Sequence, residues 1–166
     1  MVIIYKSNTG YTEQYAKLLS RELDIPAYSA ESIPACHYGQ DVIFMGWVMA
    51  GKIMGYGSVV KKCRVCAVVG VGMGPDLPEL VPGFRKAMHL TNGMAVFYLQ
   101  GGFDLSRLKG PFKLIMQVKN KEIAARLTMK SQRTSAEDAT LAMTRGEHSC
   151  VCPENLSKIV AWYRSR

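Results

Sequence analysis

The stretch Ser7-Asn8-Thr9-Gly10-Tyr11-Thr12 decides how the rest of the chain is interpreted. It follows Val2–Tyr5, a short β-branched apolar run that predicts a buried strand. After it, apolar positions recur at helical spacing as far as about Leu23. The hydroxyls, the amide and the glycine therefore lie between a strand and a helix N-terminus, where backbone N–H groups lack intrahelical partners and the helix dipole is positive. This combination predicts a phosphate-binding loop.

Further along the chain, continuous apolar runs alternate with amphipathic segments. The strands expected after the first are Ala27–Ser29, Val42–Val48, Val65–Val71 and Met94–Leu99. Helices are expected near Gly83–Leu90, with Asp76 and Glu79 as a capped start, over Phe112–Lys130, and along the stripe of Leu156, Ile159, Val160 and Tyr163. Apolar strands alternating with helices indicate a parallel sheet covered on both faces, which binds ligands beyond the carboxyl ends of its strands.

The hexapeptide resembles the [Ser/Thr]-x-Thr-Gly-x-Thr phosphate loop of flavodoxins, which hold FMN. Ser7, Thr9, Gly10 and Thr12 occupy the four defined positions. The order of strands and helices down to about residue 100 is also similar to that family. The resemblance implies an α/β fold: a flavodoxin-like three-layer sandwich whose five-stranded parallel sheet has the order 2-1-3-4-5, with helices on both faces. We expect one such domain over residues 1–166, with FMN bound non-covalently.

The same resemblance implies that the loops after the third and fourth strands hold the isoalloxazine ring. These positions fall on Val48–Ile53 and Val71–Asp76, and both are glycine-rich. Flavodoxins commonly place an aromatic side chain on each loop. Here neither loop has one, so Trp47 is interpreted as strand core and Tyr56 as a residue that could swing in. The residues expected to bind FMN are Ser7, Asn8, Thr9, Gly10, Tyr11, Thr12, Val48, Met49, Ala50, Gly51, Lys52, Val71, Gly72, Met73 and Gly74.

The charge distribution points to an anionic partner. The chain has 21 Lys+Arg against 13 Asp+Glu, a net charge of +8, and most of this surplus lies between Leu105 and Gly146. We interpret 105–152 as a basic and polar insertion before the terminal helix. Gln100–Phe103 followed by the basic Phe112–Met116 resembles the flavodoxin-type, quinone-dependent protoporphyrinogen oxidases. A solvated helix face without a partner explains the charge equally well.

Three functions therefore stay open. The first is an FMN-dependent electron-transfer protein with a redox partner protein. The second is an oxidoreductase acting on a bound organic substrate, with a quinone or an anionic small molecule as its partner. The third is a non-redox binding module that uses its basic face. Charge leaves room for peripheral membrane contact, but no nucleic-acid-binding motif accompanies it.

Other chemistries find less support in the sequence. The five cysteines are odd in number, and no secretory signal precedes them, so we expect reduced thiols in the cytoplasm. Neither Cys63-x-x-Cys66 nor Cys150-x-Cys152 has the second half of a zinc site, and we expect no metal. Gly70-x-Gly72-x-Gly74 lacks the third glycine of a dinucleotide fingerprint, which argues against NAD.

Overall fold

The computed structural model describes the chain except residues 104–110, 135–136, 138–140 and 142–147. The chain forms two compact units. The first comprises Met1–Gly101 together with Val151–Arg166, and the second comprises Gly102–Cys150. The insertion expected at 105–152 largely coincides with the second unit.

A parallel sheet forms the centre of the first unit. Its order is β2-β1-β3-β5-β6, and the bounds are β1 Val2–Lys6, β2 Ala27–Ser29, β3 Asp41–Met49, β5 Arg64–Gly72 and β6 Ala95–Gln100. Every neighbouring pair on this path is parallel. Counted along the path, this is the 2-1-3-4-5 order of the flavodoxin-like fold, as predicted.

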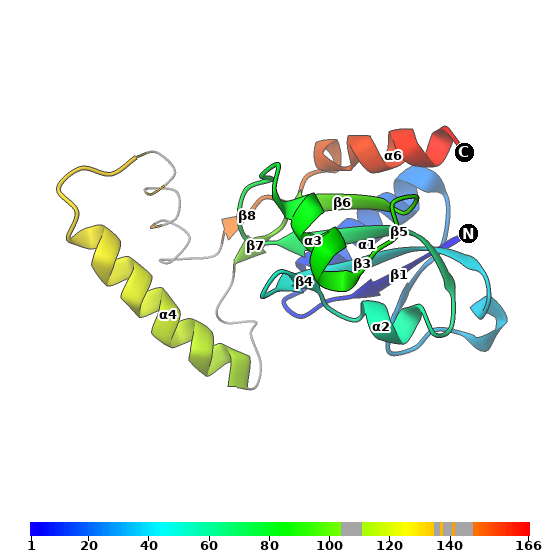
Figure 1. Cartoon of the computed structure of the whole chain (residues 1–166), viewed down its shortest axis with the longest axis horizontal. Helices are drawn as coiled ribbons and strands as arrows, with labels where there is room; N and C mark the ends of the chain where they lie inside the picture. Colours follow the sequence, from blue (N-terminus) through cyan, green and yellow to red (C-terminus); the bar gives the residue numbers. More distant parts are fainter. Residues whose placement is uncertain (104–110, 135–136, 138–140, 142–147) are drawn as a thin grey trace. The chain divides into compact units, whose positions relative to one another are not determined.

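Helices cover both faces of this sheet (Figure 1). α1 (Tyr11–Leu23) and α6 (Ser157–Arg164) pack on one face, where Leu19 and Ile159 share a core with Ile43 of β3. α2 (Tyr56–Val59) and α3 (Leu80–Met88) pack on the other, where Phe84 shares a core with Phe44. Successive β3 residues thus face opposite layers, which explains why the strand has no charged residue after Asp41.

The start of α3 differs from the prediction. Among the residues that the structure describes, no side chain caps this helix: Glu79 has helical backbone angles, and Asp76 instead pairs with Lys158 of α6 at 3.3 Å. The helix also begins at Leu80, before Pro82. A proline in the first turn is tolerated because the N–H groups there have no intrahelical acceptor.

Two short 3-10 helices complete the first unit, η1 (Ala35–His37) and η2 (Pro153–Leu156). In the second unit, β7 (Gly102–Phe103) pairs antiparallel with β8 (His148–Ser149), and α4 spans Pro111–Thr128. The predicted helix at Phe112–Lys130 is therefore confirmed. None of the helices in the described ranges is long and apolar enough to cross a membrane.

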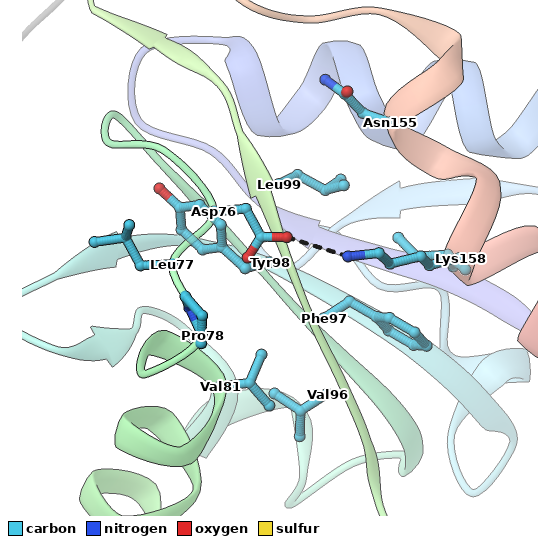
Figure 2. Close-up of a pocket in the computed structure, with 11 residues that line it drawn as sticks. Asp76, Leu77, Pro78, Val81, Val96, Phe97, Tyr98, Leu99, Asn155 and Lys158 are labelled. Carbon is cyan, nitrogen blue, oxygen red and sulfur yellow. Dashed lines mark hydrogen bonds and ion pairs between the residues drawn. The ribbon is translucent and has the colours of Figure 1, made fainter. Parts of the chain in front are cut away.

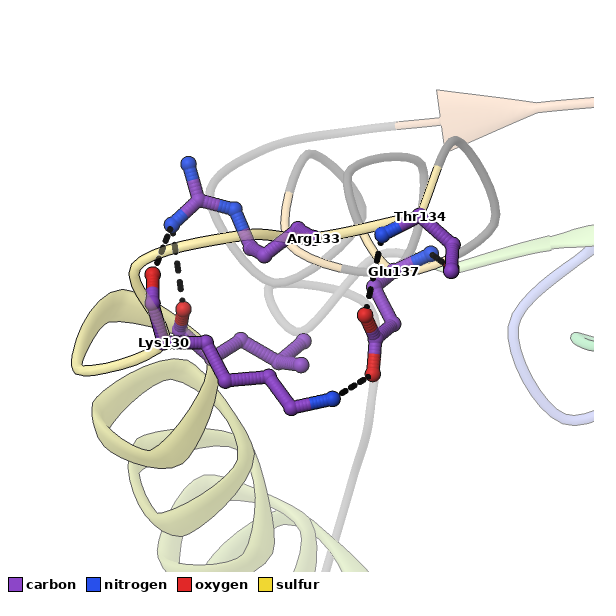
Figure 3. Close-up of polar contacts among 5 residues, drawn as sticks. Lys130, Arg133, Thr134 and Glu137 are labelled. Atoms are coloured by element: carbon purple, nitrogen blue, oxygen red, sulfur yellow. Dashed lines mark hydrogen bonds and ion pairs between the residues drawn. The ribbon is translucent and has the colours of Figure 1, made fainter.

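Polar contacts organise the chain after α4 (Figure 3). The Arg133 guanidinium donates to the Leu127 carbonyl at 3.1 Å, at the C-terminal end of α4. Thr134 and Glu137 form a reciprocal capping box, with Thr134 N–H to the carboxylate at 3.0 Å and Glu137 N–H to the hydroxyl at 3.3 Å. Hydrogen bonds from Lys130 and Thr134 lower the pKa of Glu137 below its ordinary value.

Candidate functional site

Three of the segments that follow strands lie at one edge of the sheet. β1, β3 and β5 are adjacent and parallel, and residues at or near their carboxyl ends are register partners, Lys6 with Gly46 and Trp47 with Val71. Their carboxyl ends therefore meet at the same edge. The structure thus brings together all three groups of residues that the sequence nominated, near 7–12, 48–52 and 71–74.

The loop between β1 and α1 is closed by a glycine and a serine. Gly10 has a φ of 92°, the left-handed region that favours glycine, and it is the residue just before α1. Its N–H donates to the Ser7 hydroxyl at 3.1 Å, and its carbonyl accepts from Gln14 at 3.0 Å. Ser7 therefore accepts inside the loop while its own O–H remains able to donate to a ligand.

Thr12 is the buried polar residue of this loop. Only 2% of it is exposed, and it lies in the first turn of α1. Within the described part of the chain, no residue hydrogen-bonds its hydroxyl. A buried hydroxyl without a partner costs about 1–3 kcal/mol. An anionic ligand at the helix N-terminus would supply an acceptor for this hydroxyl, so the loop fits a phosphate group.

The lysines beside the loop are already paired. Lys17 binds Glu13 at 2.6 Å, one helical turn apart, and this hydrogen bond raises the pKa of Lys17. Lys6 binds Glu31, which also accepts from Ser29. Burial opposes ionisation of Glu31, but the hydrogen bonds from Lys6 and Ser29 hold its pKa below the usual value. An anion in this loop would therefore depend on backbone N–H groups and hydroxyls.

The second predicted segment is a tight hairpin, where the sequence led us to expect an open loop. Val48 and Met49 belong to β3, and Lys52 begins β4 (Lys52–Ile53), which pairs antiparallel with β3. The two-residue turn between them, Ala50-Gly51, has positive φ at both positions, 48° and 74°. This is the backbone of a primed hairpin turn, whose twist matches that of the strands.

Two glycines hold this hairpin against the sheet. Gly46 and Gly70 are register partners in β3 and β5, and Ile53, only 3% exposed, lies over both. A Cβ at Gly46 would lie 2.5 Å from the Met54 carbonyl oxygen and 2.7 Å from Ile53. The Ile53 N–H also contacts the Met88 sulfur of α3 at 3.2 Å. The hairpin is therefore a packed wall of the site.

In the third segment, 71–74, the structure gives Gly72 a different role from the one that the sequence suggests. We expected glycine here so that a flat ring could lie against the backbone. At Gly72, however, the space of a side chain is filled by Tyr98, whose hydroxyl would lie 2.5 Å from a Cβ. At Gly74 no atom of the described residues lies within 4 Å of the position that a Cβ would take. Gly74 thus leaves room for a ligand, whereas Gly72 leaves room for Tyr98.

The aromatic residues considered from the sequence lie as follows. Tyr56 packs against Phe44, with ring centroids 6.1 Å apart, and its hydroxyl lies 3.9 Å from the Met94 sulfur. Burial there raises its pKa. In this structure Tyr56 therefore packs against Phe44. Trp47 is half-buried near the end of β3.

Four residues at this edge were not predicted as site residues from the sequence: Lys6, Glu31, Tyr98 and Gln100. The first two flank the phosphate loop, and the last two contact the segment after β5. One feature of the sequence could have indicated Tyr98 and Gln100. They alternate along an apolar strand, so two polar side chains lie on one face at its carboxyl end.

A groove of about 390 Å³ follows the free edge of β6 (Figure 2). Its floor is Val96–Leu99, and its walls come from the segment before α3 and from the η2–α6 region. The Asp76–Lys158 ion pair crosses it. In the portions of the chain that the structure describes, no three His, Cys, Asp or Glu side chains gather as a metal site.

No family model matches the chain, and no curated protein matches it. Among solved structures, a flavodoxin from the domain Archaea aligns with 87% of this chain and 95% of its own, at 11% identity and a TM-score of 0.39. The assignment to the flavodoxin-like fold rests on the strand order and on the helices that cover both faces of the sheet.

Proposed function

We propose that this protein binds FMN non-covalently at the carboxyl edge of β1, β3 and β5 and transfers electrons through it. The observation that carries the proposal is the Thr12 hydroxyl, which is buried at the N-terminus of α1 and has no partner among the described residues. A phosphate at this helix end would accept from that hydroxyl and from the backbone N–H groups of the first turn. FMN supplies the one- and two-electron chemistry when it is bound.

The chain supplies position and shielding. The Ser7 hydroxyl and the left-handed Gly10 shape the phosphate loop. The hairpin of β3 and β4 and the segment after β5 would form the two walls for the ring. Lys52, exposed at the start of β4, would stabilise negative charge on the reduced ring.

A titration of apoprotein with FMN and with riboflavin tests this proposal. We expect FMN to bind much more tightly than riboflavin, because only FMN carries the phosphate. Thr12→Val should weaken FMN on the order of tenfold while leaving riboflavin unchanged, since it removes one charge-assisted hydrogen bond.

Thr91→Val is the matched control, because Thr91 is exposed and lies outside this edge. Equal affinities for FMN and riboflavin in the wild-type protein would refute a phosphate site in the loop. The double substitution Thr9→Ala with Gly10→Val should abolish FMN retention altogether.

The second unit favours a particular kind of electron acceptor or substrate. Between Leu105 and Gly146 there are nine Lys/Arg and three Asp/Glu, and this stretch lies within the compact unit Gly102–Cys150. As a second candidate, we propose an FMN-dependent oxidoreductase that acts on a quinone or on an anionic substrate, and this charge would attract the anionic substrate. Turnover with such a compound that falls steeply with salt would favour the enzyme over the carrier.

A further inference from the structure

Three consecutive carbonyl groups after β5 are turned toward β6. Those of Gly72–Gly74 accept, in order, from the Gly101 N–H at 2.7 Å, from Gln100 Nε2 at 3.3 Å and from the Tyr98 hydroxyl at 2.7 Å. The donors are thus one backbone group and two side chains from the end of β6 and the residue that follows it. An extended strand alternates its carbonyls, so this row is a local departure from strand geometry that β6 holds in place.

The backbone N–H groups of this segment consequently face away from β6. None of the described peptide bonds is cis, and in a trans peptide the C=O and N–H vectors are opposed. The Met73 and Gly74 N–H groups therefore point to the side opposite the donors. In the described residues neither N–H has a hydrogen-bond acceptor, and both residues are exposed. Because Pro75 has no N–H, the N–H groups that face away from β6 in this segment are those of Met73 and Gly74.

Two parallel N–H groups on an exposed segment favour negative charge on whatever lies against them. Carbonyl oxygens in the same place would repel it. When FMN takes up two electrons and one proton, its ring system carries one negative charge. A peptide flip in this segment would place a carbonyl oxygen, in place of an N–H group, against the reduced ring. The negative charge on the ring would then be repelled, and the reduction potential of the bound FMN would fall.

We infer that Tyr98 and Gln100 are positioning residues that keep the carbonyls of Met73 and Gly74 turned away from the FMN ring and thereby raise its reduction potential. This inference rests on the proposed function. Neither side chain needs to touch the ring, because each acts through the peptide that it holds.

Tyr98 also has a packing role, and the experiment must separate that role from the hydrogen bond that its hydroxyl donates to the Gly74 carbonyl. Its ring stacks near Phe84, with centroids 6.2 Å apart, and fills the space beside Gly72. Tyr98→Phe keeps this ring and removes only the hydroxyl. Gln100→Met keeps the length of the side chain and removes its donor. Tyr28→Phe is the matched control, since Tyr28 lies on β2, at the far edge of the sheet from β6.

The test measures FMN affinity in the oxidised and the dithionite-reduced states, together with the midpoint potential of the bound flavin. For Tyr98→Phe combined with Gln100→Met, we expect affinity for reduced FMN to fall about tenfold more than affinity for oxidised FMN. This ratio corresponds to a midpoint about 30 mV lower for a two-electron couple. Tyr28→Phe should leave both values at those of the wild type.

Equal losses of affinity in the two states would overturn the inference, because a purely structural role moves both alike. An unchanged potential in the double variant would overturn it as well, while leaving FMN binding itself intact. A wild-type protein that binds no FMN would refute the proposed function and this inference together.

Discussion

Replacing Gly46 with alanine should destabilise the first unit more than the same change at its register partner Gly70. At Gly46 the nearest atom to a new Cβ is the backbone oxygen of Met54, at 2.5 Å, so the hairpin must move as a whole. At Gly70 the nearest atoms belong to the side chains of Val48, at 3.0 Å, and Ile53, at 3.2 Å. Overpacking costs about 1–3 kcal/mol. We expect about 3 kcal/mol for Gly46→Ala and about 1 kcal/mol for Gly70→Ala.

A second substitution separates contact with a side chain from contact with the backbone. Ile53→Val removes Cδ1, one of the atoms nearest to Gly70, and costs about 1 kcal/mol on its own. It should therefore relieve Gly70→Ala, with a favourable coupling of about 1 kcal/mol in a double-mutant cycle. It should not relieve Gly46→Ala, because the Met54 oxygen and Ile53 Cγ2 remain.

Urea unfolding followed by tryptophan fluorescence measures these differences in the right part of the chain. Both tryptophans, Trp47 and Trp162, belong to the first unit. The midpoint and the slope together give the free energy of unfolding. A Gly46→Ala protein as stable as the wild type, or more stable than Gly70→Ala, would mean that the hairpin does not lie over these glycines.

Three further outcomes follow from the structure. Thr12→Val should leave the free energy of unfolding of the FMN-free protein, measured in urea, unchanged or raise it by up to about 1 kcal/mol, because a buried hydroxyl without a described partner is replaced by a methyl group. A large loss of stability would contradict this. A hydrogen bond from Arg64 lowers the pKa of Asp41. The pair therefore contributes its full stability above the ordinary pKa near 3.9, and this contribution is lost as the pH falls through the lower folded-state pKa. Asp41→Asn should flatten the acid side of the curve of thermal midpoint against pH, and an unchanged acid side would argue against the pair. Thr134→Ala should disrupt the reciprocal hydrogen bonds with Glu137 and cost about 1 kcal/mol of stability within the second unit. Amide hydrogen exchange around Glu137 should then show weaker protection. The unfolding midpoint from tryptophan fluorescence, which reports on the first unit, should stay unchanged.

The order of strands and helices followed from local patterns. Ala27–Ser29 and the long strands of the centre were predicted within one or two residues because apolar runs bounded by turn residues depend on nearby sequence alone. The placement of Ser7–Thr12 between β1 and α1 was predicted for the same reason.

Contacts between distant segments explain what the sequence did not reveal. The turn at Ala50-Gly51 lacks the Asn-Gly signal of a primed hairpin, and Ala50 adopts a positive φ against its own preference. Asp76 has a local capping role available but pairs with Lys158, which lies far along the chain. Gly72 is small because Tyr98 needs the space, and no local pattern around Gly72 carries that information.

The position of α6 in the chain has a consequence for folding during synthesis. This helix closes one face of the sheet, where Trp162 lies edge-on to Phe97 of β6 with centroids 6.0 Å apart. About fifty residues of the second unit separate β6 from the segment that returns to it. At about 5–20 residues per second, a ribosome needs roughly 2 to 10 s to make them. During that interval the apolar strip beneath α6 stays uncovered on the nascent chain, which makes it a natural point of engagement for chaperones and the part of the sheet most exposed to premature association.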